Sequence, residues 1–163
     1  MKTLLIMRHA KSSWKDEAQP DEQRPLNKRG QADAPRMGQL LRENSLTPRA
    51  ILSSKAVRAK QTALAVAEAC GFEGDIQLEA SLYGAPAETY LHLLRALPAE
   101  PPIVMVVGHN PGVEELLVEL TGEDEHLSTG SIARLELDLA RWADLRSETT
   151  GRLETLWRPR ELP

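Results

Sequence analysis

Short apolar runs alternate with amphipathic segments along the chain, and this alternation restricts the possible folds more than any other feature. The clearest run is Ile103–Val107, which is typical of a strand buried on both faces of a sheet. Thr3–Met7 has the same character. Between such runs, apolar residues recur at steps of three and four, as on one face of a helix. Strands that alternate with helices predict an α/β domain, a three-layer α/β/α sandwich around a mostly parallel central sheet.

The same pattern gives approximate bounds for each element. We expect strands at residues 3–7, 50–52, 76–78, 103–107, 131–137 and 152–157, and helices at residues 28–43, 56–70, 86–97 and from 111 onward. Asn27 and Asn110 are candidate N-caps, and Pro111 suits the first position of its helix. Pro35 should kink the first helix or delay its start. The polar stretch 11–25 predicts a long loop, a length that is often functional.

Composition limits the function classes. The chain has 163 residues, which suits a single domain over residues 1–163, and its net charge of −4 disfavours nucleic-acid binding through a general positive field. No apolar stretch approaches the roughly 20 residues that cross a bilayer. The single cysteine, Cys70, is interpreted as core filler on a helix and is typical of a reducing compartment. We therefore expect a cytoplasmic protein without membrane association, and the low charge without an obvious exposed apolar stripe favours a monomer.

Cations and histidines follow three of the predicted strands. Arg8 and His9 follow the first strand, Arg58 comes soon after the second, and His109 follows the strand at 103–107. Ligands of open α/β sheets bind at the carboxyl ends of the strands, so we expect these side chains to converge. A lone histidine or arginine in such a place is usually structural. Together, the four residues favour a dianionic ligand such as a phosphoryl group.

The order of these motifs resembles the histidine phosphatase superfamily, whose members have a phosphoglycerate mutase-like fold. Arg8-His9-Ala10 resembles the family's nucleophile motif, Ser54 to Thr62 its Ser-x-x-x-Arg-x-x-x-Thr motif, and Gly108-His109 its second histidine motif. The stretch from Arg24 to Gly30 resembles the segment that opens the family's first helix. The resemblance spans about residues 2–138. The residues from Arg8 to Trp14, with the compact length, are most similar to the phosphohistidine phosphatases of the SixA type.

The resemblance implies a catalytic and phosphate-binding set formed by Arg8, His9, Arg58 and His109. His9 would be the nucleophile that accepts the phosphoryl group and forms a phosphohistidine intermediate. The arginines would stabilise the charge of the equatorial oxygens, and His109, if protonated, would add a donor. The resemblance implies no cofactor. The implied partner is a protein that carries phosphohistidine, or a small phosphate ester.

One departure from the family concerns the general acid. Many members place a carboxylate near the position of Ser81, ahead of Leu82-Tyr83-Gly84. The other candidates for this role are all weak: Glu79, Glu88, Asp16 and Asp21. Loss of a general acid matters for an alkoxide leaving group and matters less for a phosphoramidate, whose imidazole can be protonated at its other nitrogen. The departure favours phosphohistidine over sugar phosphates.

Other interpretations stay open at this point. A phosphatase of small phosphomonoesters would use the same residues. A non-catalytic phosphoprotein-binding module would keep the arginines without needing both histidines. A mutase is disfavoured because the chain lacks room for the usual insertions. A receiver domain would need paired acidic residues after the first strand, and a cysteine phosphatase would need Cys-x5-Arg, which Cys70 does not begin. His92 and His126 lack ligand-spaced partners, so we expect no metal.

Overall fold

A computed structural model describes residues 1–147 and 151–163. Within them, six strands form one sheet in the order β3-β2-β4-β1-β5-β6. The strands are β1 Lys2–Arg8, β2 Ala50–Ser54, β3 Gln77–Glu79, β4 Ile103–Gly108, β5 Ile132–Leu137 and β6 Gly151–Trp157. β1, β4, β2 and β3 pair in parallel, whereas β5 runs antiparallel to both β1 and β6. The predicted mostly parallel sheet is confirmed, with one antiparallel strand near its edge.

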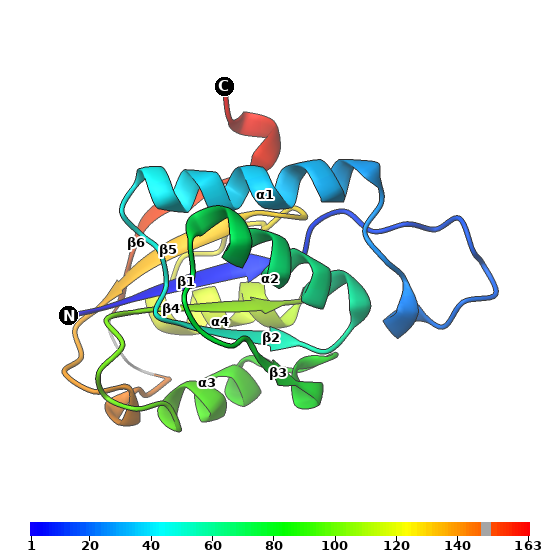
Figure 1. Cartoon of the computed structure of the whole chain (residues 1–163). Helices are drawn as coiled ribbons and strands as arrows, with labels where there is room; N and C mark the ends of the chain where they lie inside the picture. Colours follow the sequence, from blue (N-terminus) through cyan, green and yellow to red (C-terminus); the bar gives the residue numbers. More distant parts are fainter. Residues whose placement is uncertain (148–150) are drawn as a thin grey trace.

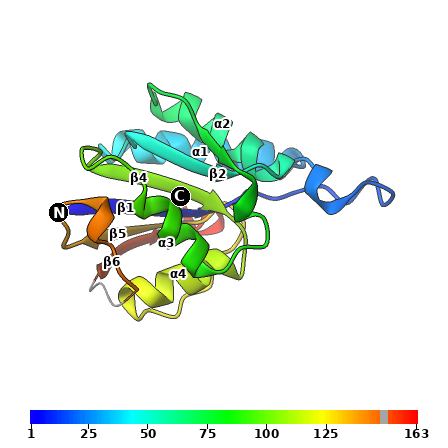
Figure 2. The ribbon, with the colours of Figure 1, turned by 90° about the horizontal axis from the view of Figure 1, so that it is seen from below.

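The helices cover both faces of the sheet (Figures 1 and 2). One layer holds α1 Lys28–Glu43 and α2 Val57–Cys70, and the other holds α3 Ala87–Arg95 and α4 Gly112–Thr121. Alternate residues of β1 face opposite layers, because successive side chains of a strand point to opposite faces. Leu5 and Met7 join the core under α1 and α2, while Leu4 and Ile6 join the core under α3 and α4. The three-layer α/β/α prediction is confirmed.

Most element bounds match the sequence prediction within two residues, but the start of α4 does not. Asn110 does not cap this helix, which begins at Gly112 after Pro111. The side-chain nitrogen of Asn110 donates to the carbonyl of Leu127 at 3.0 Å, and its side-chain oxygen accepts no hydrogen bond from the amides of the first turn of α4. The predicted delay at Pro35 is also wrong, since α1 begins at Lys28 and continues through the proline. The cap prediction for Asn27 is confirmed, because its side chain accepts a hydrogen bond from the Gly30 amide.

The stretch between β1 and α1 forms a long loop that extends beyond the end of the sheet (Figure 1). A short 3-10 turn, Asp21–Gln23, lies in it. An isolated bridge between Ser12 and Leu26 closes its base. The loop therefore starts directly after Arg8 and His9 and brings its own side chains to the same edge of the sheet. No helix among the described residues is long and apolar enough to cross a membrane.

Candidate active site

His9 lies directly after β1, and its hydrogen bonds define its tautomer. Its Nδ1 lies 2.8 Å from the carbonyl oxygen of Ala10, which can only accept, so Nδ1 carries the proton. The Nε of Arg58, which can only donate, lies 3.3 Å from the His9 Nε2. The two contacts place an unprotonated Nε2 in the centre of the site. A neutral imidazole held in this way presents a lone pair that can act as a nucleophile.

Arg58 reaches the site from the first turn of α2 and is only 6% exposed. Besides its contact to His9, its Nη1 donates to the backbone carbonyl of Asp21 at 2.7 Å and its Nη2 to the Asp21 carboxylate at 3.0 Å. Three of its five N–H groups are thus in use, and one hydrogen on each Nη stays available for a ligand. The backbone is fixed too, because Thr62 bonds the Arg58 carbonyl and the Ala10 amide.

His109 follows β4 and faces His9, with the two ring centroids 5.2 Å apart. Its Nε2 lies 2.8 Å from the hydroxyl of Ser54 at the end of β2. Its Nδ1 is buried and has no hydrogen-bond partner among the described residues. Since an unpaired buried polar atom is costly, this nitrogen is a candidate contact for a bound ligand.

A close backbone approach behind His109 depends on Gly108. A Cβ at this position would collide with the hydroxyl of Tyr90, which accepts a hydrogen bond from the His109 amide at 3.3 Å. Burial raises the pKa of Tyr90 to about 12, so its hydroxyl stays protonated. The glycine lets the end of β4 and α3 pack closely, and this packing fixes the histidine.

Arg8 contributes the third cation. Its Nη1 donates to the carbonyl of Leu127 at 3.1 Å, and its Nε is buried without a partner among the described residues. The Gly130 amide lies within hydrogen-bonding distance of both the Arg8 and His9 carbonyls. Residues 127–130 therefore pack against the end of β1. The structure brings Arg8, His9, Arg58 and His109 together at one edge of the sheet, and their catalytic roles stay predictions.

The charges of the site favour neutral histidines when no ligand is bound. Burial lowers the pKa of His9 to about 3, with further lowering by His109, Arg58 and Arg8. Burial likewise lowers the pKa of His109 to about 4, with Arg58 and Arg8 acting in the same direction. The cause is the desolvation of a charged ring beside fixed positive charges. An anion bound between these groups would reverse part of this effect.

Asp21 is the acidic residue that the structure places beside this set. Its carboxylate contacts Arg58, and it also accepts from the Arg24 Nε at 3.0 Å and from the Tyr83 hydroxyl at 2.5 Å. The Tyr83 hydrogen bond, together with Arg24 and Arg58, holds the pKa of Asp21 well below its usual range. A carboxyl group that is ionised so easily is a poor proton donor. The two contacts of Asp21 to Arg58 fix the position of the guanidinium.

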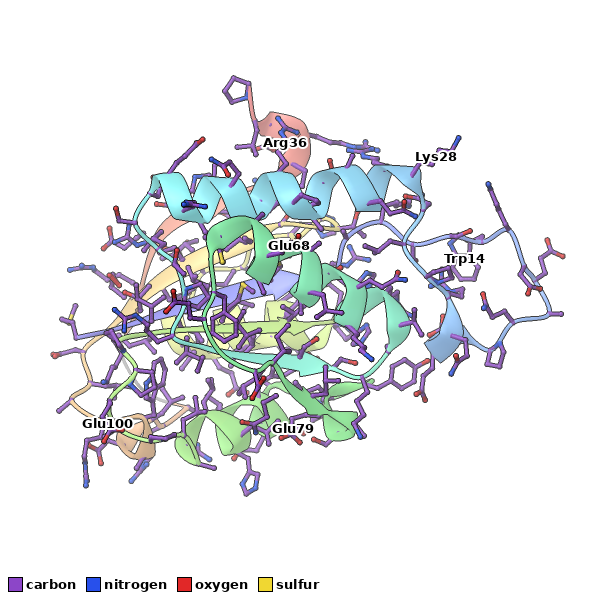
Figure 3. The ribbon with its side chains drawn as sticks, in the orientation of Figure 1. Trp14, Lys28, Arg36, Glu68, Glu79 and Glu100 are labelled. Carbon is purple, nitrogen blue, oxygen red and sulfur yellow. The ribbon has the colours of Figure 1, made fainter. Side chains whose placement is uncertain are left out.

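The other three candidate acids lie in contacts of their own. Asp16 accepts from the backbone amide of Ala18 in the exposed loop. Glu79, at the end of β3 (Figure 3), accepts from Gln77 at 2.6 Å, and Glu88 pairs with Arg95 at 2.9 Å. None of the described contacts joins any of these three carboxylates to the two histidines.

Sequence patterns missed two members of the site, Tyr83 and Ser54 in its role as a partner of His109. The Tyr83 ring packs edge-on against His109 with the centroids 5.5 Å apart. Both residues belong to stretches that resemble family motifs, Ser54 to Thr62 and Leu82 to Gly84, so the motif positions were a usable signal.

No group of three His, Cys, Asp or Glu side chains among the described residues could hold a metal ion. The absence of a metal stays a prediction.

A family model for the histidine phosphatase superfamily (branch 1) matches residues 4–83. An uncharacterised chloroplastic protein of Arabidopsis thaliana is 35% identical over 150 residues, which cover 86% of this chain and 69% of that protein. An uncharacterised protein of Mycobacterium tuberculosis is 33% identical, over 85% of this chain and 91% of its own.

Two solved structures resemble the whole chain. One, from Agrobacterium tumefaciens and provisionally named phosphohistidine phosphatase SixA, superimposes with a TM-score of 0.83 at 32% identity and covers 97% of this chain and 98% of its own. The protein histidine phosphatase SixA complexed with tungstate gives a TM-score of 0.85 at 25% identity, with 99% of each chain covered. Fold and site together define a phosphatase. The chain belongs to the histidine phosphatase superfamily and is SixA-like.

Proposed function

We propose that this phosphatase removes the phosphoryl group from phosphohistidine on a protein, through a phosphohistidine intermediate on His9. The observation that carries the proposal is the fixed tautomer of His9, with its Nε2 lone pair between Arg58 and His109. The solved SixA structure holds tungstate, an oxyanion shaped like phosphate. We also propose that residues 1–163 form one domain that acts as a cytoplasmic monomer. The free, buried Cys70 thiol agrees with a reducing compartment.

In the first step, the His9 Nε2 attacks the phosphorus and the bond from phosphorus to the substrate nitrogen breaks. The free N–H groups of Arg58, together with Arg8, stabilise the oxygens of the transferring group. The His109 Nδ1, which lacks another partner, is suited to contact one of these oxygens when it carries a proton. In the second step, water attacks the phosphorus, the bond to Nε2 breaks, and inorganic phosphate leaves with His9 neutral again.

The nature of the leaving group separates phosphohistidine from alkyl phosphates. An alkoxide needs a proton donor as it departs, and Asp21, the carboxyl beside the site, is held ionised. An imidazole can take a proton from solvent at its other nitrogen and depart neutral. A site whose neighbouring carboxyl is ionised therefore favours a phosphoramidate over an alkyl ester.

A phosphatase of small phosphomonoesters is the second candidate, since the same residues would bind its phosphate group. A non-catalytic binding module is less consistent with the site, because binding alone does not require the tautomer of His9 to be fixed. The test is hydrolysis of a histidine-phosphorylated carrier protein beside a panel of phosphate esters that includes para-nitrophenyl phosphate and glycerol phosphate. We expect fast release of phosphate from the carrier, slower release from the aryl ester and scarcely any from glycerol phosphate. Equal turnover of all three would overturn the proposal in favour of a general phosphatase.

A further inference from the structure

A basic hollow lies beside the candidate active site. Its volume is about 240 Å³, and its lining includes Arg8, Lys11, Arg29, His126, Ser128 and Arg160. Arg8 also belongs to the candidate catalytic set, so hollow and active site share one side chain. No aspartate or glutamate lines the hollow. In a chain with a net charge of −4, this local excess of cations calls for a ligand of opposite charge.

The cations of the hollow are only partly neutralised. Arg29 lies 3.4 Å from Asp33 on the next turn of α1, and His126 contacts Glu114 at 2.9 Å. Lys11 and Arg160 form no ion pair with any carboxylate of the described residues. Both are exposed, and so is Arg29. These long side chains can therefore turn toward an anion that approaches from solvent.

Backbone contacts hold together the segments that supply these cations. The Lys11 carbonyl accepts from the Asn27 amide at the start of α1, and Gly30 leaves no space there for a side chain. Arg36 donates to the carbonyl of Pro159, which positions the C-terminal turn Pro159–Glu161 that bears Arg160 (Figure 3).

The loop before β5 is attached to the same turn. Arg158 donates to the His126 carbonyl at 3.0 Å, and Pro159 packs against Gly130, whose amide bonds the carbonyl of His9. Four segments distant in sequence are thereby built around one basic hollow next to His9. An accidental cluster of surface cations would not need such a scaffold.

We propose that this hollow binds a carboxylate side chain of the phosphoprotein substrate, next to its phosphohistidine. The proposal rests on the proposed function and adds a recognition site to it. Exposed cations on long side chains suit a carboxylate on a protein surface, whereas the phosphoryl group meets buried and fixed donors around His9. An acidic residue near the phosphohistidine would bind here while the phosphoryl group reaches the His9 Nε2.

The test uses two synthetic phosphohistidine peptides that differ only in having Glu or Gln on both sides of the modified residue. The variant is Arg29→Gln with Arg160→Gln, and the matched control is Arg42→Gln with Arg49→Gln, which removes the same charge away from the hollow. We expect the wild type and the control to hydrolyse the Glu peptide with a kcat/KM about two- to tenfold above the Gln peptide at low salt. The preference should fall with ionic strength and should vanish in the variant. All three proteins should hydrolyse para-nitrophenyl phosphate equally.

Three results would count against the subsite, and they differ from failure of the proposed function. Equal rates on both peptides for the wild type, or a preference retained by the variant, would remove it. A variant that loses selectivity for 3-phosphoglycerate over glycerol phosphate, with no effect on the peptides, would assign the hollow to the carboxylate of a small phosphate ester instead. If neither peptide is hydrolysed while para-nitrophenyl phosphate is, the phosphohistidine function itself fails, and the subsite with it.

Discussion

Two regions of the site lie beside the histidine pair, the buried donors at the sheet edge and the exposed side chains of the long loop. They differ in burial and in the elements that position them. On the phosphoryl side, His9 and Arg58 are each 6% exposed and His109 is 7% exposed, and all three sit at ends of elements that belong to the sheet or pack on it. On the side of the long loop, the side chain of Asp21 is 46% exposed and Trp14 is 67% exposed (Figure 3). The buried donors beside the two histidines are therefore preorganised, and the loop side is open to solvent.

Under the proposed function, catalysis and substrate selectivity would depend on different parts of the molecule. Preorganised donors in a dry site stabilise the charge of a transition state without reorganisation. An open side with an ionised carboxylate does little for a poor leaving group and leaves room for a bulky one. The loop also fixes one of the buried donors, because Asp21 accepts two hydrogen bonds from Arg58. Arg24, whose guanidinium lies 3.5 Å from the centre of the Trp14 ring, donates to Asp21 in turn.

The largest expected effect concerns the nucleophile. We predict that His9→Ala abolishes both turnover and the acid-labile phosphoenzyme, because the proposed covalent bond to phosphorus forms at the His9 Nε2. Rapid-quench labelling with a radioactive phosphohistidine donor measures this, and binding of vanadate shows whether the pocket persists. A phosphorylated His9→Ala protein would place the nucleophile elsewhere.

The next effect concerns the rigid side. Arg58→Ala should weaken phosphate binding and reduce kcat together, with a loss of about 2.7–4 kcal/mol in transition-state stabilisation, as for other preorganised donors. Steady-state kinetics and inhibition by inorganic phosphate measure the two parts. Lys60→Ala, on an exposed position of the same helix, is the control and should change neither. A loss below threefold for Arg58→Ala would contradict the comparison of the two sides.

The fold and the rigid half of the site could be predicted from the sequence because both depend on local patterns. Apolar runs such as Ile103–Val107 set the strands, and the rule for strand ends placed His9, Arg58 and His109 at one edge. The loop could not be predicted in this way. Nothing in the spacing of Asp21 indicates that its carboxylate meets Arg58, 37 residues away in sequence.

The same distinction explains the wrong cap at Asn110. Local preference favours an asparagine before a helix, but the tertiary contact to the Leu127 carbonyl determines where this side chain points. The interpretation of Asp21 as a weak acid candidate also lacked its partners. The hydrogen bonds from Tyr83, Arg24 and Arg58 hold the pKa of its carboxyl well below the usual range.

A third prediction concerns acid stability. The pKa values of His9 and His109 lie below the usual value for histidine, so the unfolded chain binds more protons at mildly acidic pH. Stability should be greatest above about pH 6.5 and should fall as the pH decreases toward 4, by up to about 1.4 kcal/mol per pH unit for each histidine. Asp21 adds a loss only below about pH 4, its ordinary titration range.

Urea unfolding at pH 7, 6 and 5 without phosphate measures this dependence. His9→Gln should reduce the slope, because it removes one of the two buried imidazoles. Addition of phosphate should flatten the slope as well, because a bound dianion favours protonated histidine. Identical stability at pH 7 and 5 would contradict the burial of two neutral histidines as its cause.

A smaller effect is expected for Asp21→Asn. The change removes the charge that holds Arg58 but keeps the shape of the side chain, so we predict about a tenfold loss of kcat/KM, or about 1.4 kcal/mol. A positioning residue acts on the phosphoryl side, so the loss should be equal for aryl and alkyl phosphates. Asp16→Asn in the same loop is the control and should have no effect. A loss confined to alkyl phosphates would identify Asp21 as the general acid.

The smallest effect separates the two sides most directly. Glu79→Gln and Glu88→Gln should each change hydrolysis of para-nitrophenyl phosphate and of a phosphohistidine peptide by less than about twofold, since their carboxylates contact Gln77 and Arg95 and not the histidines. Without a working acid, the rate should instead depend steeply on the leaving-group pKa, which a series of substituted phenyl phosphates measures. The pH profile should then lack a limb from a carboxylic acid. A thousandfold loss in either variant would show that a carboxyl group does protonate the leaving group. Phosphate esters would then be as consistent with the site as phosphohistidine.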